Sequence, residues 1–363
     1  MSDRSGGPVI RPRSRDRDRA LASVHREWDG RVLPALVRAA RPGVELPAWV
    51  ADHRAMLDDL ARTAGAVLLR GFDVDGPAGF AAVMDSLSGE VLDYGERSSP
   101  RHRVVGRVYT STDHPADQPI VPHNEQSYVR DWPLRIVFYC DTPPAAGGRT
   151  PLADSRKVLA RLRPRTRARF ERSGVLYTRT YLPGISLPWP EAFQTDRRSD
   201  VEAYCAAQAI ACEWVGGDRL RTRQTRPAVH VHPHTGERVW FNHALFFHVT
   251  SLPAEVGAGL RSALAERDLP YNTYFGDGSP IGDEVLDELR AAYQAETVGF
   301  DWRPGDVLVV ENMLVAHGRE AFVGPRRVLV AMADRRSSVA EPTPEAVVGS
   351  GPMVSPAPAP VAW

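Results

Sequence analysis

Residues 304–319, with the sequence PGDVLVVENMLVAHGR, are the stretch from which the fold can be worked out. The opening Pro-Gly-Asp is typical of a tight turn, and the apolar run 307–310 that follows predicts a buried β-strand. His317 stands directly before Gly318, where we expect the chain to turn again. A histidine in this place is either an ordinary hydrogen-bonded side chain at a strand end or a metal ligand, so its partners must be sought elsewhere in the sequence.

The rest of the chain alternates short strands with helices in an irregular order. Apolar, β-branched and aromatic runs predict strands at 66–69, 134–139, 175–181, 219–231, 238–241 and 327–332. Apolar residues at helical spacing predict helices at 49–60, 77–87, 155–173, 198–210, 253–267 and 283–295. Because the helices do not follow a βαβ rhythm, the order favours a mainly β jelly roll with helical insertions over a doubly wound sheet.

The two ends of the chain differ in composition from its middle. Residues 1–21 hold Ser, Gly, Pro and alternating charges, and residues 336–363 hold repeated Pro, so neither end can fill a core. We therefore expect a flexible N-terminal arm at 1–21, one folded domain at 22–335 and a flexible Pro-rich tail at 336–363.

The overall composition excludes several classes of protein. Among its 363 residues the chain has 45 Lys and Arg against 45 Asp and Glu, so it lacks the positive field of a non-specific nucleic-acid binder. No run of about 18 uncharged apolar residues is present, and none of the three cysteines stands in a CxxC pair. We expect a cytoplasmic protein without nucleic-acid or membrane partners.

A second histidine lies near a carboxylate in the middle of the chain. His123 and Glu125 are two residues apart, and on an extended segment their side chains would share one face. Alone, such a pair is usually an ordinary surface or hydrogen-bonded pair. Together with His317, however, two histidines and one carboxylate would form the facial triad of a non-haem Fe(II) site, which leaves three positions for oxygen and a cosubstrate. A jelly roll brings early and late strands together in the way this requires.

A dicarboxylate cosubstrate would also need an arginine, because the guanidinium forks onto a carboxylate. Arg326 directly precedes the predicted strand 327–332 and Arg327 begins it, and alternation allows only one of them to face inward. Arg326 follows Pro325 at the turn, whereas Arg327 lies one step into the paired strand. We therefore favour Arg327 and keep Arg326 as the alternative.

A rival metal site is suggested by a cluster of histidines at 230–243. His230 and His232 would share a face if this stretch were extended. The sequence Pro-His-Thr-Gly-Glu at 233–237 is more typical of a hairpin turn. We interpret the cluster as turn and strand residues, with Trp240 and Asn242 as candidate pocket walls, and we assign Trp132 to the core.

Three blocks of this sequence resemble a known family. They are His123-Asn-Glu125-Gln-Ser-Tyr128, Cys140-Asp-Thr-Pro-Pro-Ala-Ala-Gly-Gly-Arg-Thr150-Pro-Leu-Ala-Asp154, and the segment from Asn312 to Arg327. In this order they resemble the Fe(II)- and 2-oxoglutarate-dependent dioxygenases of the taurine dioxygenase and clavaminate synthase type. The resemblance implies a double-stranded β-helix core and Fe(II), 2-oxoglutarate and O2 as cofactor and cosubstrates.

The resemblance also implies roles for individual residues. His123, Glu125 and His317 would be the iron ligands, and Thr150 with Arg327, or else Arg326, would hold the 2-oxoglutarate carboxylate. Many relatives have Asp in place of Glu125, whereas a subgroup that modifies amino acids in peptide natural-product pathways has His-Asn-Glu. In related halogenases a small residue replaces the carboxylate, so Glu125 favours hydroxylation.

The function predicted on this basis is hydroxylation of an unactivated C–H bond, with release of succinate and CO2. The substrate would be a small amino-acid-like molecule, free or tethered to a carrier protein, in natural-product and antibiotic biosynthesis. Two alternatives belong to other classes. One is a non-catalytic β-helix that binds a small molecule or a partner, and the other is a hydrolase that holds zinc with the same ligands.

Overall fold

The computed structural model describes residues 21–93, 102–112 and 114–338. Almost all of the predicted N-terminal arm and most of the predicted tail, namely residues 1–20 and 339–363, therefore lie outside the described residues. The last strand continues to Ser337, which pairs with Asp131, so the sheet extends two residues past the predicted domain end. The division into arm, domain and tail stays a prediction.

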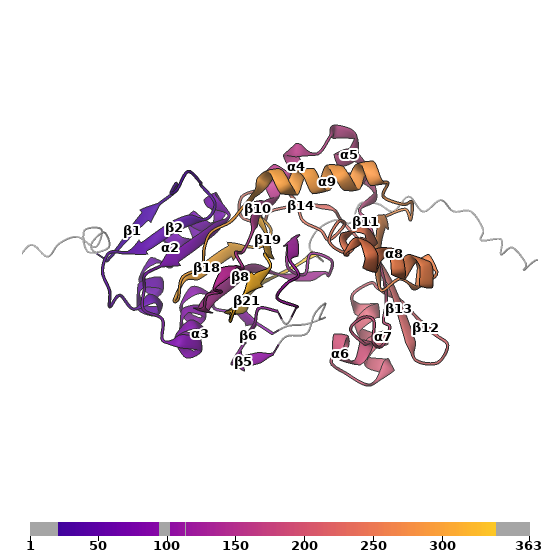
Figure 1. The fold of residues 1–363 in the computed structure, drawn as a ribbon, viewed down its shortest axis with the longest axis horizontal. Coiled ribbons are helices and arrows are strands. Elements are labelled where there is room, and N and C mark those ends of the chain that lie inside the picture. The colour runs from indigo at the N-terminus through magenta and orange to yellow at the C-terminus, as the bar shows by residue number, and fades with distance from the viewer. Residues whose placement is uncertain (1–20, 94–101, 113, 339–363) are drawn as a thin grey trace, which may run out of the picture.

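The largest element is a nine-stranded sheet that joins both ends of the folded chain (Figure 1). Its strands, in spatial order, are β1 (Ala22–His25), β2 (Ala35–Ala39), β3 (Ala66–Arg70), β18 (Val307–Glu311), β8 (Asp131–Thr142), β21 (Arg327–Ser337), β6 (Val108–Thr110) and β5 (Arg103–Val105), with β4 (Val91–Leu92) beside β21. Among the strand pairs of the described residues only β2 and β3 run parallel. The late strand β18 lies between the early strands β3 and β8, as the predicted jelly roll requires.

A smaller sheet faces the large one and completes the sandwich. Its order is β17 (Thr297–Val298), β10 (Leu152–Asp154), β19 (Val315–Arg319) and β7 (Ile120–His123). Apolar side chains of both sheets pack into one buried cluster, in which Phe138 and Leu308 of the large sheet meet Leu152 and Val315 of the small one. The predicted jelly-roll core is therefore confirmed.

Two helices cover the other face of the large sheet. In α2 (Leu46–Ala64) and α3 (Gly76–Leu87) the apolar residues recur on one face, and Trp49, Leu57 and Phe80 pack into the same cluster as the outward side chains of β3 and β18. The helix α2 ends at Gly65, whose φ of +84° suits glycine and whose Cα lies against the Val315 side chain. Because both faces of its central strands are covered, this sheet is apolar on both sides.

The segment between β10 and β17 forms the second half of the molecule (Figure 1). Its helices are α4 (Ser155–Arg161), α5 (Pro164–Ser173), α6 (Trp189–Phe193), α7 (Arg198–Ala207), α8 (Ala254–Ala263) and α9 (Asp283–Glu296). Its strands are β12 (Ala211–Val215), β13 (Arg219–Arg226), β11 (Val175–Thr180) and β16 (Tyr271–Phe275) in one sheet, and the hairpin of β14 (Val229–Val231) and β15 (Arg238–Trp240). We call residues 155–296 the insertion.

Two predicted elements of the insertion are divided by proline. The single helix predicted at 155–173 is two helices, because Pro164 begins α5 and the residues before it are extended. The single strand predicted at 219–231 is split between β13 and β14 at Pro227.

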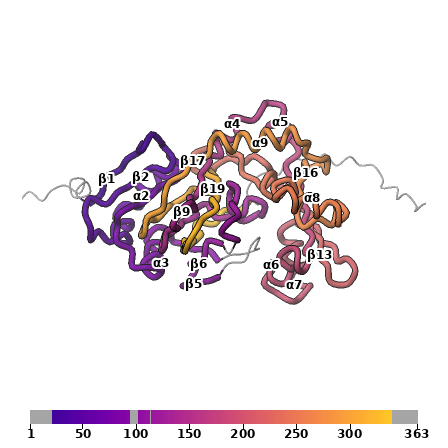
Figure 2. Tube along the Cα trace, viewed as in Figure 1, coloured from indigo at the N-terminus to yellow at the C-terminus, as the bar shows by residue number. Residues whose placement is uncertain are grey.

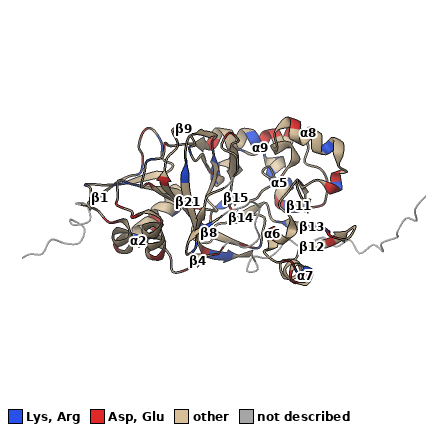
Figure 3. Cartoon of the chain, turned by 60° about the horizontal axis from the view of Figure 1, so that its bottom comes forward, with Lys and Arg blue, Asp and Glu red and all other residues tan. Residues whose placement is uncertain are grey.

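The path of the chain and its charges are visible in two further views. The tube in Figure 2 shows the yellow C-terminal strands running among the indigo and purple N-terminal ones, while the insertion lies apart. Figure 3 shows Lys and Arg interspersed with Asp and Glu, for example along α8 and α9. Within the described residues no helix is long and apolar enough to cross a membrane.

Candidate active site

Two of the predicted ligands lie opposite each other on neighbouring strands. His317 of β19 is the register partner of His123 at the end of β7, and their ring centroids are 4.7 Å apart. One ligand atom from each of His123, Glu125 and His317 lies within 4.8 Å of the other two. The side chain of Glu125 is buried, as is that of His317, so the fold brings a carboxylate and two imidazoles together at one protected point.

Glu125 reaches this point through a turn and not through the extended segment that the sequence suggested. The strand β7 ends at His123, and Gln126 has a left-handed φ of +56°. Asn312, which is fully buried, accepts a hydrogen bond from the Glu125 backbone N–H at 2.8 Å and donates one to the Glu125 carbonyl at 2.9 Å. The expectation of a shared strand face was therefore wrong, and the side chain of Asn312 holds the turn in its place.

The same network continues on either side of the ligands. Asn124 donates to the Asn312 carbonyl at 2.7 Å and to the Ser155 hydroxyl at 3.1 Å. His123 Nδ1 donates to the Val121 carbonyl at 3.0 Å, since a carbonyl oxygen only accepts. In this tautomer Nδ1 carries the proton and Nε2 has a free lone pair, which a metal ligand needs.

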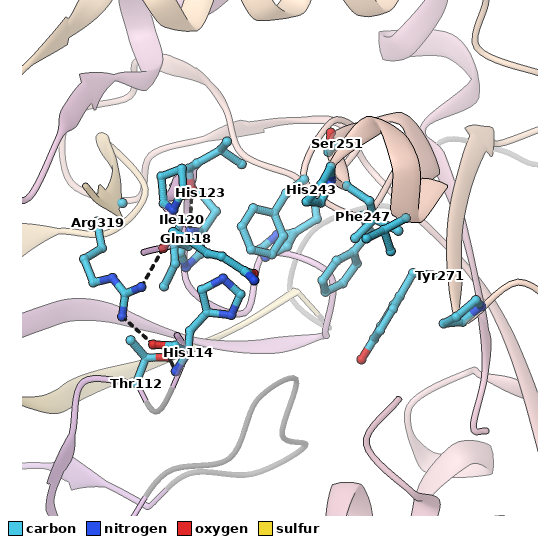
Figure 4. Close-up of a pocket in the computed structure, with 18 of the residues that line it drawn as sticks. Thr112, His114, Gln118, Ile120, His123, His243, Phe247, Ser251, Tyr271 and Arg319 are labelled. Carbon is cyan, nitrogen blue, oxygen red and sulfur yellow. Dashed lines mark hydrogen bonds between the residues drawn. The ribbon is translucent and has the colours of Figure 1, made fainter. Parts of the chain in front are cut away.

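A pocket of about 1020 Å³ opens in front of these residues (Figure 4). His123, Thr150, His317 and Arg326 line one end. The insertion lines the rest of the pocket, which we call the far end, mainly with the apolar and aromatic residues Ile185, Leu187, Phe247, Leu252, Val256, Leu260 and Tyr271. Its Phe246 lies against His123, with 4.5 Å between the ring centroids. In Figure 4 the side chains of Arg319 and Gln118 lie on one side, and those of Phe247 and Tyr271 on the other.

The two candidate arginines point in opposite directions, and the preference for Arg327 as the inward one was wrong. The Arg327 side chain is about half exposed and forms an ion pair with Asp141 at 3.1 Å. Arg326 lines the pocket, and its Nε donates to the Gly148 carbonyl at 3.3 Å. Burial, with a smaller effect of the nearby charge of Arg319, lowers the pKa of Arg326 to about 10. Both faces of β21 are apolar, so the sequence pattern did not reveal which face is the inner one.

Thr150 is buried in the pocket wall near the ligands. Its hydroxyl accepts a hydrogen bond from the indole N–H of Trp302 at 3.1 Å. The hydroxyl proton therefore remains available to a ligand in the pocket.

The rival histidine cluster forms the hairpin that its turn sequence predicted. His232 Nδ1 accepts from the backbone N–H of Thr235 at 3.1 Å, and Nε2 lies 3.2 Å from the Glu311 carboxylate. Among the described residues, only His123, Glu125 and His317 bring three potential ligand atoms of His, Cys, Asp or Glu within reach of one metal ion. Trp240 and Asn242 are buried away from the pocket, so they are not its walls. Trp132 is a core residue, as expected.

Two pocket histidines of the insertion were not predicted. His243 lies beside the ligands, with its ring centroid 5.8 Å from that of His123 and its Nδ1 2.6 Å from the Ser127 hydroxyl. His248 Nδ1 accepts from the backbone N–H of Thr250 at 3.3 Å. Burial lowers the pKa of His243 well below its usual range and that of His248 to about 4, so both rings are neutral at pH 7. His243 ends the cluster at 230–243 that the sequence assigned to turn and strand roles, and nothing in the spacing marked His248. The insertion turns both toward the site.

The donor set fits Fe(II). Two imidazoles and one carboxylate are the facial ligands of non-haem iron, and the pocket in front of them leaves room for further ligands. Zinc accepts the same donors, so the ligands alone do not choose between the two metals.

Comparisons with known proteins make that choice. The model of the "Taurine catabolism dioxygenase TauD, TfdA family" matches residues 29–332. The dapdiamide synthesis protein DdaC of Enterobacter agglomerans is 38% identical over 312 residues, which cover 86% of this chain and 94% of that protein. A clavaminate synthase-like protein of Arabidopsis thaliana is 29% identical over 85% of this chain and 95% of its own length. The structure of AAD-2 in complex with Mn(II) and N-oxalylglycine has the same fold, with a TM-score of 0.51 and 10% identity over 86% of this chain and 96% of that one.

This chain is a 2-oxoglutarate-dependent non-haem iron oxygenase, which uses Fe(II), 2-oxoglutarate and O2. It belongs to the TauD/TfdA family. The alternatives of a zinc hydrolase and of a non-catalytic binding protein are thereby set aside.

Proposed function

We propose that this oxygenase hydroxylates an unactivated C–H bond of an amino-acid substrate, free or tethered to a carrier protein, in natural-product biosynthesis. His123, Glu125 and His317 hold the iron, and Thr150 and Arg326 hold 2-oxoglutarate. The observation that carries the proposal is that the three ligand atoms, within 4.8 Å of one another, lie at the end of a pocket that Arg326 also lines.

With iron bound at these residues, O2 would be the oxidant: one of its oxygen atoms would enter the substrate and the other succinate, as 2-oxoglutarate is oxidised and loses CO2. The protein contributes orientation and the exclusion of water. Glu125 keeps a carboxylate in the ligand set, so no coordination position is vacated for a halide, and hydroxylation is the expected outcome. Asn312 keeps that carboxylate in place through the backbone of Glu125.

Arg326 suits the far carboxylate of 2-oxoglutarate on electrostatic grounds. It is an arginine held in the pocket wall near a second cation, Arg319, and the pKa of Arg326 is lowered by burial and by that charge. A dianionic ligand would offset both effects, and the planar guanidinium can bind a carboxylate through two parallel hydrogen bonds.

The nature of the substrate is supported by the relative and by the shape of the pocket. DdaC is by name a dapdiamide synthesis protein, and the match spans nearly the whole of both chains. The pocket of about 1020 Å³ has space for an amino-acid substrate in addition to 2-oxoglutarate. Its far end is apolar and aromatic, so the part of the substrate that lies there would be largely uncharged.

Anaerobic titration of the purified protein with Fe(II) and 2-oxoglutarate tests the assignment of the site. The wild type should develop the weak visible band of the chelate, and His317→Ala should abolish it. Arg326→Ala should weaken 2-oxoglutarate binding by about 10- to 150-fold, the effect of losing a charged hydrogen-bonded partner. Arg327→Ala is the matched control and should bind as the wild type does.

Aerobic incubation with the standard L-amino acids and their carboxamides tests the substrate class. Stimulated succinate formation, with a product one oxygen atom heavier, would support the proposal. If Arg326→Ala and Arg327→Ala lost the same amount of 2-oxoglutarate affinity, the assignment of the cosubstrate site would be contradicted. A product without added oxygen would contradict hydroxylation.

A further inference from the structure

Arg319 forms an unusual set of bonds at the edge of the pocket. It extends from β19, two residues after His317, and its side chain lies within the protein, with 4% of the residue exposed. Its Nη1 donates to the His114 carbonyl at 2.8 Å, and its Nη2 donates to the carbonyls of Gln118, at 2.6 Å, and of Pro115. Figure 4 shows the guanidinium facing these residues.

The partners of this guanidinium are backbone oxygens, which are neutral. The residue is almost fully buried, and removing its charge from water is costly. The hydrogen bonds to the carbonyls offset this cost, together with the ring of Phe322, whose centroid lies 5.1 Å from the guanidinium carbon. Arg319 is thus a buried arginine bonded to backbone carbonyls, and these bonds hold the chain at 114–118.

Residues 114–118 form an exposed wall of the pocket, and we call them the anchored wall. His114, Asp117 and Gln118 line the pocket, although the segment belongs to no strand or helix. The backbone N–H of Phe322 adds a further bond, to the Ala116 carbonyl at 2.9 Å. Four of the five carbonyls in this wall thus accept hydrogen bonds from the segment that follows His317.

The anchored wall continues directly into β7, which ends at His123. Arg319 on β19 therefore links the strand of one candidate ligand to the segment leading to the other. The position of the wall, and with it the width of the pocket, depends on Arg319.

We propose that Arg319 is a positioning residue that holds the anchored wall against the substrate, so that Asp117 and Gln118 contribute to substrate selection. Asp117 is a carboxylate in the pocket lining and is suited to the amino group of a substrate. This inference rests on the proposed function, because the substrate contacted by the wall is that of the oxygenase reaction. In this proposal Arg319 does not bind 2-oxoglutarate.

The variant that tests this is Arg319→Lys, with Arg327→Lys as the matched control. Lysine keeps the positive charge but replaces the fork with a single ammonium, which cannot reach all three carbonyls in the same geometry. Arg327 is an exposed arginine eight residues further along the chain, paired with Asp141. The comparison therefore separates the geometry of the guanidinium from its charge.

Three readouts are compared in the two variants. Amide hydrogen exchange at Phe322, whose N–H donates to the Ala116 carbonyl of the wall, should rise in Arg319→Lys and stay at the wild-type level in Arg327→Lys. With the most active amino acid or carboxamide from the succinate screen, KM should rise by about 10- to 100-fold in Arg319→Lys while kcat changes little, since a displaced wall misplaces the substrate. The Fe(II) and 2-oxoglutarate chelate band should form in both variants.

Gln118→Ala provides a second test that leaves Arg319 intact. It should raise KM without raising hydrogen exchange, because it removes a wall side chain but no anchoring bond. Unchanged exchange in Arg319→Lys would overturn the proposal, as would raised exchange with an unchanged KM. Loss of the chelate band in Arg319→Lys would also overturn it, by placing Arg319 in the cosubstrate site.

If the proposed function itself is wrong, the chelate titration and the substrate screen of the wild type show it. If the wild type forms the chelate but accepts none of the probes, the substrate class is wrong, and hydrogen exchange alone decides whether Arg319 holds the wall. If the wild type forms no chelate, the site assignment itself is wrong.

Discussion

The two ends of the pocket are built in different ways. At the ligand end, Glu125, Asn312 and His317 are buried and lie on or beside paired strands, and the Asn312 side chain is hydrogen-bonded to the Glu125 backbone. At the far end, the insertion presents Ile185, Leu252 and Val256, which are 56%, 41% and 49% exposed. The backbone of the ligand end is held by strand pairing, whereas the far end is apolar and more exposed.

This difference separates two tasks. Holding a metal requires donor atoms placed to within a few tenths of an ångström, which strands in register can achieve. Selecting a substrate requires a shaped surface that can change without loss of the metal site, and an insertion between two strands provides it. We therefore expect variants at the ligand end to affect metal binding and catalysis, and variants at the far end to affect KM.

The largest effect is expected from Glu125→Ala. Removing a direct ligand should reduce iron-dependent succinate formation by more than about 100-fold, because loss of an outer partner alone costs about 10- to 100-fold. Iron binding measured by anaerobic titration, with activity in parallel, checks this. Activity near the wild-type level would show that Glu125 is not a ligand.

Asn312→Ala should have the next largest effect. It leaves buried groups of Glu125 and Pro133 without their side-chain partner, and iron affinity should fall by about 10- to 100-fold. Asn242→Ala is the matched control, because Asn242 also bridges backbone groups, those of Ala228 and Ala244, in the insertion. Both variants should lose stability in thermal unfolding, but the control should keep its iron affinity. Equal iron affinities in the two variants would show that Asn312 does not support the site.

The far end should show a pH effect on stability through His248. Burial lowers the pKa of His248 in the folded protein to about 4, whereas its ordinary pKa is 6.5. As the pH falls below 6.5, this ring is therefore protonated first in the unfolded chain. The contribution of the neutral His248 ring to the free energy of unfolding is thus fully present above pH 6.5 and is lost between pH 6.5 and 4. From pH 7 to pH 5 the wild type should lose about 1–2 kcal/mol more than His248→Gln in denaturant unfolding.

The exposed His25→Gln is the control for that measurement, and its stability should fall with pH as in the wild type. If His248→Gln and the wild type lose equal stability over this range, the ring of His248 is not held in its neutral form.

The smallest effect on stability is expected from Leu252→Ala. Because this leucine is 41% exposed, the free energy of unfolding should change by less than about 0.5 kcal/mol, while KM for the substrate should rise a few-fold. Leu308→Ala, in the fully buried core of the sandwich, should cost about 2–5 kcal/mol. A large loss of stability in Leu252→Ala would show that the far end is not the adaptable part of the pocket.

The prediction of the fold from sequence was most successful where local patterns are strong. The helix at 49–60, the strand at 307–310 and the strand at 327–332 all appear in the structure, because apolar spacing and turn residues act over a few positions. The failures occurred where proline divides an element, as at Pro164 and Pro227. Of the insertion histidines that line the pocket, His243 was assigned to turn and strand roles with the cluster at 230–243, and His248 gave no local signal.

By itself the sequence determined the chemistry available to this protein, since two histidines, a glutamate and a pair of arginines were recognisable from residue type and local order. Only the tertiary structure decided which arginine enters the pocket and that Asn312 holds Glu125. It also decided that Arg319 anchors residues 114–118. The physical reason is that residue type and periodicity act locally, whereas these choices depend on pairing between strands that lie far apart in the chain and on which face of β21 is the inner one.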